Sequence, residues 1–289
     1  MLKRIILILT EKYKQDVKES GELLSFMEEM KKHGTEVEMH GKNEAESETG
    51  KQRFAADAEA LFFSDAADEL SQLQAKDCYT VAVYHEGVSG LLSGTQFAVE
   101  GIRDIEWEYL YKVYQRFCGE PWSISETIRC TIREMGPGDV DALYELYSGP
   151  NVTRYMEGLF LKKEQEEQYI KDYVENVYKY YGFGTWLVHR KEDGRLIGRA
   201  GFNYRQGFEE AELGFMIGED FWRQGYAYEV CSHLMKLADK VYELGQVQAF
   251  VKKENTASVC LLEKLGFIRC EEVEMDGENY QRYMAELAL

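Results

Sequence analysis

The chain of 289 residues is long enough for two ordinary domains or one large one. With 45% apolar and 13% aromatic residues it can bury a substantial core, which excludes wholesale disorder. Its 52 acidic residues against 34 basic ones give a net charge of −18. Such a charge disfavours a general nucleic-acid surface and favours the attraction of cationic substrates.

The six cysteines form no CxxC pair and have no histidine at metal-ligand spacing, so we expect reduced thiols and no metal site. Cys231 and Cys260 fall on apolar faces of predicted helices, which suits small buried side chains. The run IILIL near the N-terminus is too short for a signal-peptide core, and no run reaches membrane-spanning length. We therefore expect a cytoplasmic protein with no membrane partner.

The first part of the chain alternates short apolar runs with segments of helical periodicity. Strands are expected at RIILIL (4–9), EVEMHG (36–41), ALFFSD (60–65) and YTVAVYHE (79–86). Helices are expected at GELLSFMEEMKKHG (21–34), AADELSQLQAK (66–76) and EWEYLYKVYQRFCG (106–119). This alternation is typical of an α/β domain in which helices cover a mainly parallel sheet.

Residues 62–86, FFSDAADELSQLQAKDCYTVAVYHE, faintly resemble the second half of a haloacid-dehalogenase-like phosphatase core. The resemblance implies paired aspartates after the first strand, but RIILILTEKYK supplies none. We therefore expect a degenerate module of this kind, used for packing or recognition and without phosphatase activity.

A domain boundary is expected where the prolines begin. All three prolines lie between residues 121 and 150, and CGEPWSISE (118–126) separates an aromatic helix from a fresh strand pattern. We predict an α/β accessory domain over residues 1–125 and a second domain over residues 126–289.

The second part of the chain shows strands flanked by a few helices. Strands are expected at TIRCTIRE (127–134), TWLVHR (185–190), LIGRAGFNY (196–204), AELGFMI (211–217), VQAFVKK (247–253) and twice near the C-terminus. Helices are expected at DVDALYELYS (139–148) with Asp139 as N-cap, at residues 162–184, from Tyr226, and at NTASVCLLEKLGF (255–267). The Asp193-Gly194 turn predicts a hairpin. Together, the strands and helices of this part indicate an α+β fold with a mixed, mostly antiparallel sheet.

The helix that begins at Tyr226 lacks a capping side chain, because Gln224 and Gly225 stand where Ser, Thr, Asp or Asn is usual. Gly225 permits a positive φ or a close backbone approach. The unpaired N–H groups of the first turn, together with the helix dipole, can bind an anion such as a phosphate. Water could satisfy the same groups, and the glycine alone does not decide between them.

Two motifs on these elements occur in order. WRQGYA (222–227) joins a strand to this helix, and NTAS (255–258) opens a helix that closes with EKLGF (263–267). Together they resemble the GNAT superfamily of acyl-CoA N-acyltransferases, whose motifs are Q/R-x-x-G-x-G/A and N-x-x-S/A with a K-x-G-F-type helix end. GRAGF, AELGFMI and YAYE look most like the branch of ribosomal-protein N-terminal acetyltransferases. The resemblance covers roughly residues 127–289 and implies a GNAT-like fold.

The resemblance also implies how the acetyl donor, acetyl-CoA, is bound. Main-chain groups of Phe215, Met216 and Ile217 would pair with the pantetheine arm like an added strand. Asn255 would reach the pantetheine, with Ser258 nearby. The pyrophosphate would be held by amides of Arg223, Gln224, Gly225, Tyr226, Ala227 and Tyr228. Arg223, Lys252, Lys253 and Lys264 could meet the ribose phosphate, although plain surface charge is the simpler explanation for each lysine.

For catalysis the resemblance points to Glu212 as the general base, acting directly or through water. The alternative is a structural glutamate paired with an arginine such as Arg199. Many relatives place a tyrosine before the EK of the second motif as the acid for the departing thiolate, and here that residue is Leu262. Cys260, Ser258 or water could take this role, so the acid is unassigned.

Residues 151–160, NVTRYMEGLF, lie where this fold places the loop that covers the acceptor. Tyr155, Met156 and Glu157 would then contact the amine, although a packed loop would have the same sequence. We predict an N-acetyltransferase that moves an acetyl group from acetyl-CoA to a small-molecule or peptide primary amine by direct attack in a ternary complex. The alternative is a non-catalytic regulatory or interaction protein that binds acyl-CoA. The oligomeric state stays open.

Overall fold

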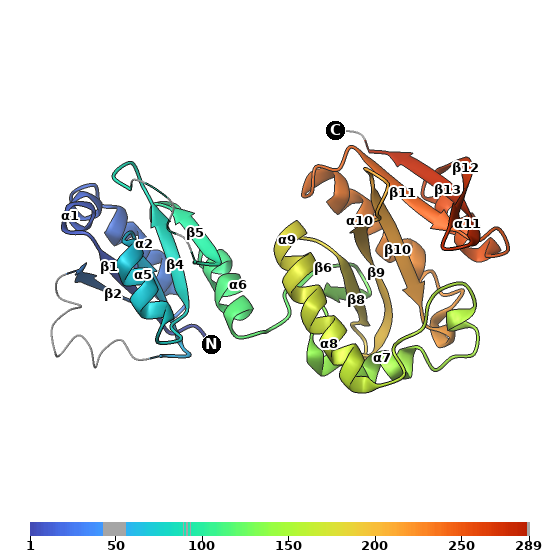
Figure 1. Cartoon of the computed structure of the whole chain (residues 1–289), viewed down its shortest axis with the longest axis horizontal. Coiled ribbons are helices and arrows are strands. Elements are labelled where there is room, and N and C mark those ends of the chain that lie inside the picture. The colour runs from blue at the N-terminus through green and yellow to red at the C-terminus, as the bar shows by residue number, and fades with distance from the viewer. Residues whose placement is uncertain (43–55, 89, 91, 93, 288–289) are drawn as a thin grey trace. The chain divides into compact units, whose positions relative to one another are not determined.

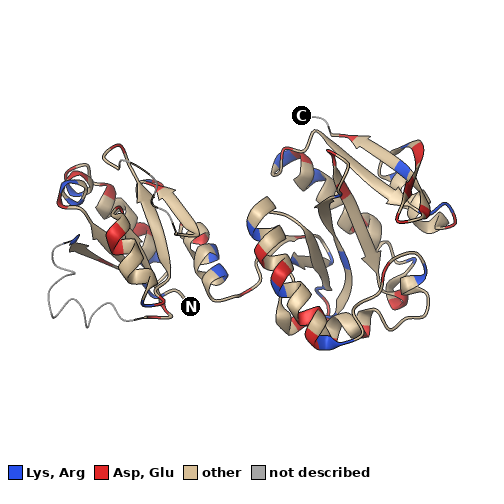
Figure 2. Ribbon diagram, viewed as in Figure 1, with Lys and Arg blue, Asp and Glu red and all other residues tan. Residues whose placement is uncertain are grey.

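The computed structural model describes residues 1–42, 56–88, 90, 92 and 94–287 (Figure 1). The chain forms two compact units, Met1–Glu120 and Pro121–Leu289. Each unit has its own sheet and its own hydrophobic core. Acidic and basic residues are interspersed along the described parts of both units (Figure 2).

The first unit contains a five-stranded sheet in the order β2-β1-β3-β4-β5, and every neighbouring pair is parallel, as predicted. Its strands are β1 (Arg4–Leu9), β2 (Glu36–Gly41), β3 (Ala60–Ser64), β4 (Thr80–Tyr84) and β5 (Phe97–Glu100). Its helices are α1 (Glu11–Glu19), α2 (Glu22–Lys32), α5 (Ala67–Gln74) and α6 (Trp107–Phe117). Strands β1 and β3 are buried almost throughout, because helices cover the sheet.

The second unit contains an eight-stranded sheet in the order β12-β13-β11-β10-β9-β8-β7-β6. Its strands are β6 (Ser123–Glu126), β7 (Cys130–Arg133), β8 (Thr185–Arg190), β9 (Leu196–Tyr204), β10 (Ala211–Ile217), β11 (Gln246–Val251), β12 (Ile268–Met275) and β13 (Glu278–Glu286). Only β10 and β11 pair in parallel, which confirms the mixed, mostly antiparallel sheet. The boundary predicted after residue 125 falls inside β6, which pairs with β7 in this sheet.

Helices of the second unit lie against the sheet and supply the large core. They are α7 (Val140–Leu146), α8 (Lys163–Tyr173), α9 (Lys179–Tyr181), α10 (Tyr226–Lys240) and α11 (Thr256–Lys264). The predicted helix over residues 162–184 is interrupted by a π-helical turn at Val174–Tyr178. Tyr178 is buried there, and its hydroxyl donates to the Thr185 carbonyl at 2.5 Å, which ties this turn to the start of β8.

Three local expectations have clear outcomes. Asp139 stands at the N-cap of α7, but its carboxylate accepts hydrogen bonds from Arg133 and from the Gly136 amide instead of capping α7. Cys231 is fully buried, as its helix face predicts. The placement of Cys260 on an apolar face is wrong, because α11 packs along its other side and leaves this thiol exposed.

Candidate active site

The candidate site begins where two parallel strands separate. β10 pairs with β11 only at Ala211 and Glu212, although β10 continues to Ile217 and β11 to Val251. Past Glu212 the β11-facing edge of β10 therefore has no ladder partner among the residues that the structure describes. The GNAT resemblance of the sequence implies that this edge, at Phe215, Met216 and Ile217, pairs with the pantetheine arm. One acceptor is already used, because the Trp222 indole donates to the Ile217 carbonyl at 2.6 Å.

The loop from β10 to α10 brings a helix start to the same end of the sheet. Gly225 is the N-cap of α10 with φ +83°, and no side chain caps the helix. Arg223 also has a positive φ, of 59°, so two left-handed residues turn the chain sharply into the helix. Within the described residues, the amides of 223–228 find no acceptor. The predicted open helix end is thus present, with its N–H groups available to an anion.

Arg129 supports this loop from the beginning of β7. Its guanidinium donates to the Gln224 carbonyl at 3.0 Å and to Glu229 at 2.6 Å. The same group lies over the Tyr226 ring, 4.2 Å from the ring centroid. A Cβ atom at Gly225 would lie 3.5 Å from its Nη2. Sequence reasoning missed Arg129, because its partners are about a hundred residues away along the chain.

Glu229 fixes Arg129 with several hydrogen bonds. Besides the guanidinium, it accepts from the Thr127 hydroxyl at 2.7 Å and from the Arg129 amide at 2.8 Å. Burial alone would raise the pKa of Glu229, but these donors outweigh it and hold the pKa below its usual value. The carboxylate therefore stays charged and keeps the arginine beside the loop.

The second motif forms a capped helix start. Asn255 is the N-cap of α11, and its side chain accepts from the Ser258 amide at 3.3 Å. At the far end Gly266 has φ +89°, and the Phe267 amide donates back to the Leu262 carbonyl, as the predicted helix end requires. Leu262 is 1% exposed and belongs to the core. It therefore occupies no place in the site from which a proton could be delivered.

The predicted phosphate-binding cations have different surroundings. Lys264 lies over the Tyr228 ring, with its nitrogen 4.0 Å from the ring centroid, at the first turn of α10. Lys252 pairs with Glu278 at 2.5 Å, which favours the structural explanation for this lysine. Arg223 and Lys253 are exposed.

Glu212 is paired with an arginine, but with Arg205 and not with Arg199. Arg205 Nε donates to one Glu212 oxygen at 2.6 Å, and its Nη2 donates to the other at 3.2 Å. The glutamate side chain is 15% exposed, at the point where β10 leaves β11. Its position fits a base beside the separated strands, and its forked ion pair fits a structural role.

The loop over residues 151–160 is attached at its first residue and at its middle. Asn151 donates to Glu219 at 2.6 Å, and the Tyr155 hydroxyl donates to the Glu254 carbonyl at 3.2 Å. Tyr155 thus connects the loop to the turn that precedes α11, while Met156 is 38% exposed and Glu157 is exposed. The loop therefore bridges to the turn between β11 and α11.

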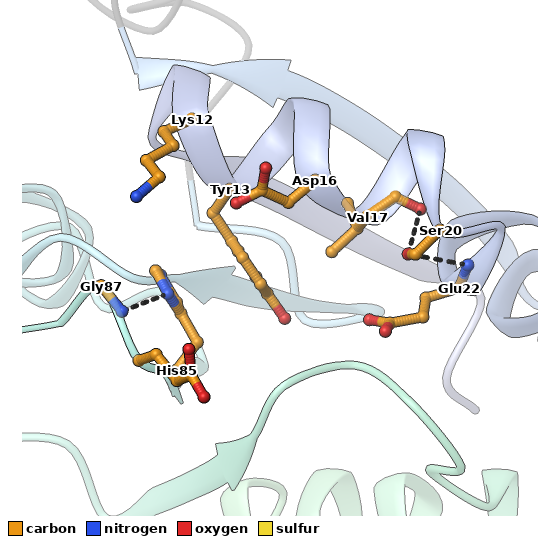
Figure 3. A pocket seen from close by; sticks show the side chains of 9 residues that line it. Lys12, Tyr13, Asp16, Val17, Ser20, Glu22, His85 and Gly87 are labelled. Carbon is orange, nitrogen blue, oxygen red and sulfur yellow. Dashed lines mark hydrogen bonds between the residues drawn. The ribbon is translucent and has the colours of Figure 1, made fainter.

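The first unit contains a separate pocket of about 260 Å³. α1 supplies one wall, and the segment after β4 supplies His85 and Gly87 (Figure 3). His85 stacks on Tyr13 with ring centroids 3.9 Å apart, and burial raises the pKa of Tyr13 to about 12. The Gly87 amide donates to His85 Nδ1, so Nε2 carries the proton and donates to Asp65 at 3.0 Å.

Asp65 also accepts from the amide and the hydroxyl of Thr10, and its side chain is 1% exposed. Three donors thus satisfy this buried carboxylate, as is usual for buried polar groups. The arrangement therefore offers no support for phosphatase chemistry in this unit.

Comparison with known proteins identifies the second unit. The profile of the acetyltransferase (GNAT) domain matches residues 129–268. The N-acetyltransferase YoaA of Bacillus subtilis, itself uncharacterized, is 32% identical over 150 residues, which are 50% of this chain and 82% of YoaA. The chain belongs to the GNAT acetyltransferase family. This GNAT protein is therefore an acetyl-transferring enzyme.

Further relatives agree with this assignment. The uncharacterized N-acetyltransferase p20 of Bacillus licheniformis is 30% identical to the GNAT chain over 142 residues, or 49% of this chain and 80% of p20. Among solved structures, a protein of Vibrio cholerae assigned as a ribosomal-protein-serine acetyltransferase is 21% identical with a TM-score of 0.50. The match covers 57% of this chain and 98% of the Vibrio cholerae protein. That likeness shows the fold alone.

Three further expectations concern the resemblance of the first unit, metal binding and membrane insertion. The haloacid-dehalogenase-like resemblance of residues 62–86 gains no support. Among the residues that the structure describes, no cluster of three or more His, Cys, Asp or Glu could hold a metal ion. No helix in that part of the chain has the length and apolar character needed to cross a bilayer.

Proposed function

We propose that this enzyme transfers an acetyl group from acetyl-CoA to a primary amine, by direct attack in a ternary complex. One observation gives the strongest support to acetyl-CoA as the acetyl donor. The open helix start at Gly225 lies next to the unpaired edge of β10. A diphosphate fits the free amides of residues 223–228, and an extended amide-containing arm fits the free strand edge. Coenzyme A contains both of these parts.

In this proposal the main chain of Phe215 and Met216 binds the pantetheine arm, and the loop at Gly225 binds the pyrophosphate. Arg129 holds the loop in shape through Gln224, and its charge favours an anion there. Lys264 lies beside Tyr228 and is placed for the ribose phosphate. Asn255 caps the start of α11, a few residues after the end of β11, and its side chain accepts from the Ser258 amide.

The chemistry needs a neutral amine that attacks the thioester carbonyl as the C–S bond breaks. In the proposal Glu212 takes the proton from the ammonium group, directly or through water, and Arg205 holds the carboxylate in place. The thiolate must gain one proton as it leaves. Leu262 carries no ionisable proton and is buried in the core, so Cys260, Ser258 and water stay as the candidates for supplying this proton.

The test uses the full chain with acetyl-CoA and a panel of primary amines, and it measures free thiol release together with the acetylated product by mass spectrometry. We expect amine-dependent thiol release with one acetyl group added per thiol. Binding of acetyl-CoA without thiol release across the panel would instead support the non-catalytic alternative.

A further inference from the structure

Arg199 carries a charge that no acidic residue of the described chain neutralises. It lies in the middle of β9, and no carboxylate of the described residues is within ion-pair distance. Its Nη1 donates to the Tyr147 hydroxyl at 3.2 Å, and its Nη2 lies 3.8 Å from the Met135 sulfur. Its Nε is buried without a hydrogen-bond partner. A guanidinium stays charged in proteins, so this burial is costly unless an anion joins it.

The tyrosines around Arg199 do not supply that anion. Burial raises the pKa of Tyr169, and it raises the pKa of Tyr178 well above the ordinary value. Both side chains are therefore neutral hydroxyls near pH 7. For Arg199 itself, burial opposes the charge, but Tyr147 and the neighbouring hydroxyls outweigh it, and the pKa is raised. The arginine thus remains positive among neutral donors and acceptors.

Arg199 lies on the same face of the sheet as the proposed catalytic residue. Antiparallel pairing sets Glu212 opposite Asn203, Gly214 opposite Gly201, and Met216 opposite Arg199. Since side chains alternate along a strand, Glu212, Met216 and Arg199 all project from one face. Val152 of the 151–160 loop packs against Met216 with Tyr147 nearby, so this face lies beneath that loop.

Between Glu212 and Met216 this face is open. A Cβ atom at Gly214 would meet no atom within 4 Å. The proposed base lies on the same face of the sheet as Arg199, and the position of β10 between Glu212 and Met216 carries no side chain. Met216 lies four positions after Glu212 along the strand. At roughly 3.3 Å per residue, their Cα atoms are about 13 Å apart.

We infer that Arg199 selects acceptors that carry a carboxylate several bonds away from the amine that is acetylated. This inference rests on the proposed function and names the substrate class of that site. A carboxylate suits a planar guanidinium, which can bind it with two parallel hydrogen bonds. One carboxylate neutralises one arginine, whereas a dianionic phosphate would need a second cation, and the neighbouring Arg205 already pairs with Glu212.

The spacing favours long acceptors. An α-amino acid holds its amine and carboxylate on one carbon atom and cannot reach from Arg199 to Glu212. An ω-amino acid or a short peptide with a distant carboxylate can. The chain's net charge of −18 acts over the whole surface, whereas this single positive group acts on a carboxylate at contact distance.

The experiment compares ω-amino acids of increasing length with their primary amides, using thiol release by the full chain. We expect the acids to exceed their amides in kcat/KM by at least about tenfold at the best length, which a single charge-assisted contact can supply. Arg199→Gln should raise KM for the acids by a similar factor and leave KM for the amides and for acetyl-CoA unchanged. Arg195→Gln serves as control, because Arg195 immediately precedes the same strand but has Glu145 and Asp220 within 3.8 Å.

Each outcome decides the inference. Turnover of acids and amides at equal rates by the wild-type chain would overturn it, even where Arg199→Gln fails to fold. An equal loss for both substrate series in a folded Arg199→Gln protein would show a structural role and would also overturn it. Absence of thiol release with every amine would overturn the proposed function, and this inference with it.

Discussion

The guanidinium of Arg129 lies over the ring of Tyr226, 4.2 Å from its centroid, and donates to the carbonyl of Gln224 at 3.0 Å. Tyr226 is the first residue of α10 and is 5% exposed. The start of β7 therefore fixes the start of α10, although the two are almost a hundred residues apart. This contact shapes the helix end to which we assign the pyrophosphate.

The first prediction concerns Gly225. Gly225→Val places a branched side chain at φ +83° and adds a Cβ atom 3.5 Å from Arg129 Nη2. We expect the Kd for acetyl-CoA to rise at least about tenfold, because the loop can no longer present its amides to the diphosphate. Isothermal titration on the folded variant measures this Kd.

Gly277→Val is the matched control, since Gly277 has φ +78° in the turn between β12 and β13 and open space around it. It imposes a comparable backbone strain away from α10. Equal acetyl-CoA affinity of the wild-type chain and the Gly225→Val variant would remove the coenzyme assignment.

The second prediction follows from the lowered pKa of Glu229. Because the folded-state pKa lies below the usual 4.5, the charged carboxylate stabilises the fold above that pH, and the stabilisation is lost as the pH falls through the folded-state pKa. Glu229→Gln should lower the free energy of unfolding at pH 7 by about 1–3 kcal/mol. This difference should stay constant down to about pH 5 and shrink below pH 4.5.

Urea unfolding at several pH values measures the effect, with Glu274→Gln on the exposed strand β12 as control. A difference that is unchanged at pH 4 would mean that the charge of Glu229 is not what stabilises this contact.

Strong local patterns allowed much of the fold to be predicted. β1, β10 and the start of α10 at Tyr226 lie at the residues expected, because their apolar periods are unambiguous. α1 was not predicted, since it buries only Tyr13 and Val17. β5 was missed because it has four residues and only Val99 among them is buried. Such short elements depend on contacts with the rest of the unit.

The candidate site was predicted less completely than the fold. Gly225 and Asn255 are part of local motifs, and their proposed roles come from the missing helix cap and from the family resemblance. Arg129 was not, because its contacts with Gln224 and Glu229 exist only after folding. The partner of Glu212 had a usable signal: Arg205 lies seven residues earlier, across the turn between β9 and β10. Antiparallel register would have favoured it over Arg199.

The third prediction concerns Leu262, at the position where relatives carry a tyrosine. It is 1% exposed within the main core of the second unit. Leu262→Ala should lower the free energy of unfolding by about 2–5 kcal/mol through the cavity it leaves. We expect kcat per folded molecule to stay unchanged, as with Leu234→Ala in the same core. Urea unfolding and initial rates at saturating substrate test this, and a selective loss of kcat in Leu262→Ala would place residue 262 in the active site.

The fourth prediction separates the two roles considered for Glu212. Glu212→Gln and Arg205→Gln both break the same forked ion pair, with its contacts at 2.6 and 3.2 Å. Only Glu212→Gln removes the carboxylate that accepts a proton. If the glutamate is the base, kcat falls by about 100-fold or more in Glu212→Gln, within the range for general bases, and much less in Arg205→Gln. Equal losses of kcat and of stability in the two variants would show a structural pair, because both changes then remove one and the same interaction. Initial rates and urea unfolding of both proteins, measured side by side, give this comparison directly.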